Sequence, residues 1–73
     1  MPDQNEWETK AANLLKAELK RKGVTYCQLT EKLGDIGVDE KEVNIRNKLA
    51  RGKFSAAFLL QCCQAIGIDE LRV

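Results

Sequence analysis

Four glycines, each placed at the end of a run of helix-favouring residues, most constrain how this chain can fold. They stand at positions 23, 37, 52 and 67. Glycine readily takes the left-handed backbone conformation with which many helices end. The runs before them predict four helices, and no stretch of four or more residues alternates apolar and polar side chains as a strand would. We therefore expect an all-α fold, one compact four-helix domain over residues 1–73.

The first helix is expected over residues 6–22. Asn5 can cap its N-terminus, and Glu8 stands three residues further on, the spacing of a capping box. Residues 1–5 would then form an N-terminal tail. Apolar side chains recur at steps of three and four residues, which predicts one buried stripe. The stripe comprises Trp7, Ala11, Leu14, Leu15 and Leu19.

The second helix is expected to follow at once, with Thr25 as its cap and Gln28 completing a second capping box. Gly34 or Gly37 could end it. We favour Gly37, because Ile36 then extends the apolar stripe. That stripe comprises Leu29, Leu33 and Ile36.

The third helix is expected over about residues 40–51, with Asp39 as its cap and Glu42 three residues on. Only residues 37–39 would then separate the second helix from the third. A connection that short forces the two helices to cross steeply, which is the helix-turn-helix geometry.

The fourth helix is expected to begin after Ser55 and to end at Gly67. Its buried side chains would be Phe58, Leu59, Cys62, Cys63 and Ile66. An apolar residue before a helix cap often packs against one in the first turn, and the pairs of this kind are Val38 with Val43 and Phe54 with Leu59. The C-terminal tail, residues 68–73, is compatible with a strand-like end, a helical turn or a dimer contact.

The outward side of the third helix is the feature that points to function. At about 100° per residue, Ile45 and Leu49 point to the core. The opposite stripe and its flanks then carry Asn44, Arg46, Asn47, Lys48 and Arg51. In the major groove, asparagine pairs with adenine and arginine with guanine, while lysine neutralises phosphate. A merely solvated helix face would more often include glutamate, so DNA contact is the favoured interpretation.

Three further residues are expected to assist DNA contact. Lys53 follows the turn at Gly52, where it could reach a phosphate, and Thr25 and Gln28 stand where backbone N–H groups of the second helix point outward. The formal net charge is only +1. Two basic blocks, residues 10–22 and 41–53, nevertheless alternate with acidic ones, and a polyanion responds to such local fields.

Segments of the chain resemble two protein families. The run Lys-Gly-Val-Thr-Tyr-Cys-Gln-Leu-Thr-Glu-Lys-Leu-Gly (22–34) and the later run Lys-Leu-Ala-Arg-Gly-Lys-Phe (48–54) resemble the two halves of a phage Cro/C1-type, lambda repressor-like helix-turn-helix. That resemblance implies sequence-specific DNA binding, usually as a dimer and in transcriptional repression. The segment between Gly34 and Gly52 is longer than that family usually has. The block from Asn44 to Phe58 is also similar to a small bacterial family of unknown function.

Catalysis finds little support among the residue types present. The chain has no His, and its carboxylates fall at helix caps and on exposed faces. Cys27, near the start of the second helix, is the one conceivable nucleophile, and a core or surface thiol is the better interpretation. Three cysteines, two of them adjacent, make no disulfide framework, and without His or Cys-x-x-Cys spacing there is no zinc ligand set. We expect no enzyme activity, no metal and no cofactor.

The partner expected is double-stranded DNA, with a homodimer as a further hypothesis because two half-sites double the contacts. The rival hypothesis is a helical adaptor or antitoxin-like module that binds protein without binding DNA, through an apolar patch around Trp7, Tyr26 and the tail. The polar, acidic N-terminus is unlike a signal peptide, and no apolar run is long enough for a membrane span. We therefore expect a cytoplasmic protein without a membrane partner or an evident small-molecule ligand.

Overall fold

The computed structural model describes residues 5–73. Four helices occupy most of this part: α1 (Asn5–Lys22), α2 (Tyr26–Asp35), α3 (Glu42–Arg51) and α4 (Ala56–Ala65). No strand occurs among the described residues, so the all-α prediction is confirmed. The predicted N-terminal tail lies outside the described residues up to position 4, and Asn5 is the first residue of α1. The cap proposed for the Asn5 side chain also lies outside what the structure describes.

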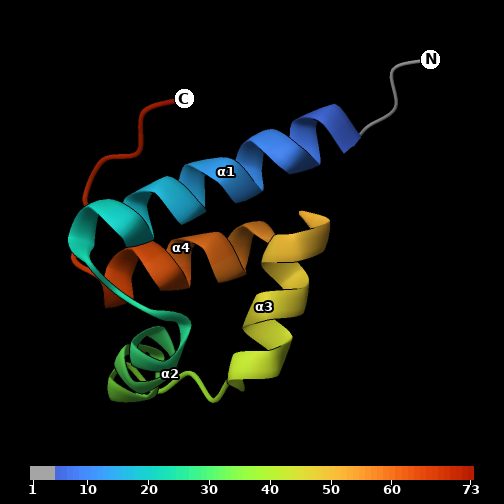
Figure 1. The fold of residues 1–73 in the computed structure, drawn as a ribbon. Coiled ribbons are helices and arrows are strands. Elements are labelled where there is room, and N and C mark those ends of the chain that lie inside the picture. The colour runs from blue at the N-terminus through green and yellow to red at the C-terminus, as the bar shows by residue number, and fades with distance from the viewer. Residues whose placement is uncertain (1–4) are drawn as a thin grey trace.

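The helices pack around one apolar core to which all four contribute. Figure 1 shows α3 steeply inclined to α1 and α4, and α3 packs against both α1 and α2 while α2 also packs against α4. Burying a leucine- or isoleucine-sized side chain stabilises a fold by roughly 1.5–3 kcal/mol. The buried cluster comprises Leu15, Leu19, Leu29, Leu33, Ile45, Leu49, Phe58, Cys62 and Ile66.

Caps read from the sequence stabilise the starts of α2 and α4. The Thr25 hydroxyl accepts a hydrogen bond from the Gln28 N–H at 3.1 Å, and the Thr25 N–H donates to the Gln28 side chain at 2.9 Å. This reciprocal pair is the predicted capping box. The Ser55 hydroxyl accepts from the Phe58 N–H at 3.0 Å, so the cap of α4 is confirmed as well.

Gly37 ends α2, as preferred over Gly34. Its backbone is left-handed, with φ of 85°. The chain then turns back so that the Val38 N–H donates to the Leu33 carbonyl at 2.9 Å. This bond satisfies a carbonyl that the last helical turn leaves open.

The beginning of α3 differs from the prediction of a start near residue 40. The N-cap is Lys41, without a side-chain capping bond, so the Asp39 cap is wrong. Glu42 pairs with Arg46 at 2.7 Å instead of completing a capping box. The connection between α2 and α3 therefore comprises six residues, 36–41, rather than the three expected.

Three apolar side chains predicted to pack inward are instead exposed: Trp7 at 71%, Ile36 at 41% and Val43 at 54%. Trp7 precedes the buried part of α1, which begins at Ala12. Ile36 follows the end of α2, so the helical periodicity no longer governs its direction. Val43 lies about 200° around α3 from Ile45, and the burial of Ile45 turns Val43 to solvent. The expected packing of Val38 on Val43 is therefore wrong.

Candidate nucleic-acid interface

The side of α3 opposite the core is open along its whole length. Ile45 and Leu49 are fully buried, which fixes the rotation of the helix. The residues turned away from them are exposed and include no carboxylate; we call this set the outward face. It comprises Val43, Asn44, Asn47, Ala50 and Arg51. Three of the predicted DNA contacts, Asn44, Asn47 and Arg51, thus share one accessible surface.

Arg46 borders the outward face on the side toward α2. Its guanidinium lies 5.7 Å from the centre of the Tyr26 ring and donates to the Glu42 carboxylate at 2.7 Å. Arg46 and Glu42 are both substantially exposed, so this pair contributes little to stability. The contact with Tyr26 places the first residue of α2 beside the middle of α3.

Lys48 takes a different position from the one expected of a phosphate ligand. Its ammonium lies 2.6 Å from a Glu40 carboxylate oxygen and 4.4 Å from the centre of the Phe58 ring. Glu40 also accepts from the Asn44 side-chain amide at 3.3 Å. The bond from Lys48, followed by those from Asn44 and the Lys41 N–H, outweighs the opposing effect of burial and lowers the pKa of Glu40 below 4.5. The ammonium of Lys48, whose side chain is 35% exposed, is thus engaged by Glu40 within the protein, and its expected contact with phosphate stays a prediction.

The C-terminal end of α3 lies against the first turns of α1. A Cβ atom on Gly52 would stand 2.5 Å from the backbone oxygen of Glu8. Lys53 is exposed, with its ammonium 3.8 Å from the Glu8 carboxylate. Arg51 makes no ion pair with any of the described residues. Two cations thus stand at this end of the outward face, and Arg51 is the less constrained of them.

Basic side chains of α1 approach the start of α2. A hollow of about 280 Å³ is lined by Lys16 and Lys20 of α1 together with Thr25 and Tyr26. Thr25 and Gln28 are exposed, although their side chains are engaged in the capping box. Because Tyr26 also contacts Arg46, this hollow continues the cationic border of α3 toward α1.

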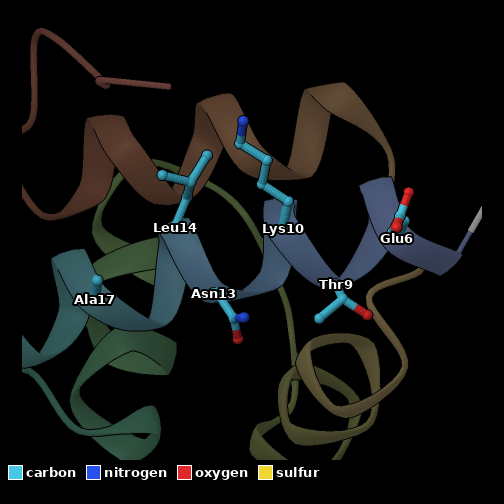
Figure 2. Close-up of a pocket in the computed structure, with 6 residues that line it drawn as sticks. All are labelled: Glu6, Thr9, Lys10, Asn13, Leu14 and Ala17. Atoms are coloured by element: carbon cyan, nitrogen blue, oxygen red, sulfur yellow. The ribbon is translucent and has the colours of Figure 1, made fainter.

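An open hollow of about 410 Å³ lies on the surface of α1. Its lining residues all come from α1, and Figure 2 shows Lys10 and Leu14 directed to one side of the helix and Thr9 and Asn13 to the other. A surface formed by one helix provides no convergence of groups from different elements. It therefore has neither the enclosure nor the converging polar groups typical of a catalytic site.

The three thiols occupy two different environments. Cys27 is exposed, whereas Cys62 and Cys63 are buried, as predicted for residues of the core. Burial raises the pKa of Cys62 to about 12, and it also raises the pKa of Cys63. Across residues 5–73 no group of three His, Cys, Asp or Glu side chains is placed to hold a metal ion. In the same part of the chain no helix is both long and apolar enough to cross a membrane.

Comparison with known proteins identifies the family. No curated protein and no solved structure matches the chain. A family model described as a domain of unknown function, DUF6471, matches residues 7–71, which include α2, α3, α4 and nearly all of α1. The block from Asn44 to Phe58, whose likeness to a family of unknown function was noted in the sequence, lies within this match. The chain therefore belongs to the DUF6471 family.

Proposed function

We propose that this domain binds double-stranded DNA by seating the outward face of α3 in the major groove. One observation carries the proposal. Two amides and a guanidinium, from Asn44, Asn47 and Arg51, line an exposed helix face that contains no carboxylate. An α-helix fits the major groove, and these are the side chains whose hydrogen-bonding groups match adenine and guanine edges there.

Asn47 and Arg51 are the principal base readers in this proposal. They stand one turn apart on the outward face, and both are exposed. Asn47 would pair with adenine and Arg51 with guanine. Asn44 already donates to Glu40 at 3.3 Å, so its amide is held in place before DNA arrives. That bond leaves Asn44 the more restricted of the two amides.

Phosphate contacts would flank the base readers on both sides. On the α2 side stand Arg46, the exposed N-terminus of α2 and the lysines Lys16 and Lys20. Lys53 stands at the other end of α3. Cations and helix N-termini supply most of the salt-dependent affinity of DNA-binding proteins. Lys48 would act on the protein side instead, by holding the Glu40 carboxylate that positions Asn44.

Selection from a pool of random duplex DNA tests the proposal. The domain is incubated with the pool at about 0.1 M salt, and bound sequences are amplified and sequenced over several rounds. Enrichment of a motif containing adenine and guanine, bound with an affinity that falls steeply as salt rises, is the expected result. Failure to enrich any motif, together with salt-independent binding, would contradict the proposal.

Pairing of two copies of the chain is a further part of this proposal, and one specific surface favours it. A groove of about 490 Å³ lies between α4 and the C-terminal tail. Leu60 borders this groove and is 68% exposed, and Val73 of the tail is 87% exposed. We propose a second copy of this chain as the occupant, since pairing would present two copies of α3 to two half-sites.

Sedimentation tests this pairing separately from DNA binding. The wild-type chain is expected to sediment as a dimer at high micromolar concentration, and Leu60→Asp as a monomer, because a carboxylate in an apolar contact is costly to desolvate. Ala17→Asp, at an exposed position of α1 away from the groove, is the control and should leave the dimer intact. A wild-type monomer at that concentration would remove the pairing.

A further inference from the structure

An apolar side chain stands among the polar groups of the outward face. Val43 is 54% exposed and contributes nothing to the buried core. It precedes Asn47 by one helical turn, and Ala50 follows one turn later, so the three form a strip along the helix. Isolated apolar side chains are common on protein surfaces. Val43 differs because of its neighbours, which are the amides and guanidinium proposed to read bases.

We propose that Val43 contacts the 5-methyl group of a thymine in the bound DNA site, an inference that rests on the proposed function. The thymine methyl is the apolar group that an unmodified base pair displays in the major groove. A valine in a helix holds one strongly preferred side-chain rotamer, so its two methyl groups are already positioned before binding. Contact with a thymine methyl removes apolar surface of both partners from water.

Helix geometry limits where this thymine lies. The Cβ atoms of residues four apart on a helix are about 5–6 Å from each other. Successive base pairs are stacked at about 3.4 Å. The thymine read by Val43 therefore lies within about two base pairs of the adenine read by Asn47. Arg51 stands one turn beyond Asn47, so its guanine lies on the opposite side of that adenine from the thymine.

Deoxyuridine provides a direct test, because it pairs like thymine and lacks only the 5-methyl group. In the motif obtained by selection, each thymine is replaced in turn by deoxyuridine, and Kd is measured by fluorescence anisotropy. For the wild-type domain, one replacement is expected to raise Kd about fourfold, which corresponds to the ~0.8 kcal/mol of one buried methyl group. The other replacements should leave Kd within about a factor of two.

Val43→Ala supplies the second arm of the experiment. This variant should bind the thymine site about as weakly as the wild type binds the deoxyuridine site, and it should no longer distinguish the two. Because alanine has the higher helix propensity, the variant should remain folded, which a thermal melt by circular dichroism confirms. Ile36→Ala shortens an exposed apolar side chain outside α3, and it should retain the wild-type discrimination.

The outcomes separate this inference from the function on which it rests. If no motif is selected, sequence-specific DNA binding fails, and the inference fails with it. If a motif is selected but no deoxyuridine replacement weakens binding, the domain reads DNA without Val43 contacting a thymine methyl. If one replacement weakens wild type and Val43→Ala to the same degree, another residue contacts the methyl, and the inference is overturned. If Val43→Ala no longer distinguishes thymine from deoxyuridine, while the wild type and the control variant still do, the inference is supported.

Discussion

The ammonium of Lys48, inside α3, lies 2.6 Å from the carboxylate of Glu40, which precedes the helix by two residues. Glu40 retains 14% of its side-chain exposure and also accepts from Asn44. This pair therefore connects the segment before α3 to a proposed base-contacting residue. The pair also engages the Lys48 ammonium, which the sequence analysis expected to contact phosphate.

Glu40→Gln is expected to destabilise the fold by about 1–2 kcal/mol at pH 7, because a half-buried ammonium loses its charged partner. The pKa of Glu40 is lowered from 4.5 in the folded state. Its contribution to the free energy of unfolding is therefore complete above about pH 4.5, and it is lost as the pH falls through the lowered pKa. Urea denaturation from pH 7 downward measures this difference. Wild type and Glu40→Gln should converge at low pH, whereas the exposed control Glu31→Gln should follow the wild type throughout.

Asn47→Ala is expected to weaken binding to the selected DNA site by roughly 1–3 kcal/mol, with little effect on non-specific DNA. Arg51→Ala should behave similarly if it reads guanine, and a uniform loss across sequences would assign it to phosphate. Asn13→Ala, an exposed amide on α1, is the matched control. Anisotropy titrations against the selected and scrambled duplexes provide the measurement. Equal affinities for wild type and both α3 variants would remove α3 from the groove.

Gly52→Ala should cost more stability than Gly37→Ala, although both glycines have a left-handed backbone. At Gly37 a Cβ atom meets nothing within 4 Å, so only the backbone penalty of about 1–2 kcal/mol applies. At Gly52 the Cβ atom would stand 2.5 Å from the Glu8 oxygen, so α1 or α3 must shift as well. Thermal unfolding of the two variants isolates this extra cost. Equal melting temperatures would mean that the two helices are not held together there.

Thiol labelling should distinguish Cys27 from the two core cysteines. A chromogenic disulfide reagent at pH 8 is expected to modify one thiol per chain rapidly, because Cys27 is exposed. Cys62 and Cys63 should react only after unfolding, since burial denies access and raises the pKa of both, to about 12 for Cys62. Cys27→Ser should abolish the fast phase. Rapid labelling of a second thiol in the native protein would contradict the burial of Cys62 and Cys63.

Helix ends set by neighbouring residues could be predicted from the sequence. Thr25 and Ser55 cap their helices through bonds that span three residues, and the bond that closes the turn at Gly37 is equally local. The start of α3 could not be predicted in this way. There the carboxylate of Glu40 bonds to Lys48, eight residues away, and Asp39 does not serve as the cap.

The candidate site could also be predicted only in part, namely where it depends on local helix geometry. Asn44, Asn47 and Arg51 were placed correctly on an exposed surface, because their positions follow from the buried stripe of Ile45 and Leu49. Val43 was assigned to the core on the basis of a local pairing with Val38. Its distance around the helix from Ile45 was the signal that could have identified it as exposed. Whether these residues bind DNA stays a prediction.

The connection between α2 and α3, residues 36–41, is too long to dictate the angle between the two helices by itself. That angle depends on the side chains packed between them, which include Leu33 and Leu49. Mild denaturant or heat that loosens this contact should therefore abolish sequence discrimination while most helical circular dichroism persists. Sequence recognition by such a domain is therefore lost at a lower temperature or denaturant concentration than its helices are.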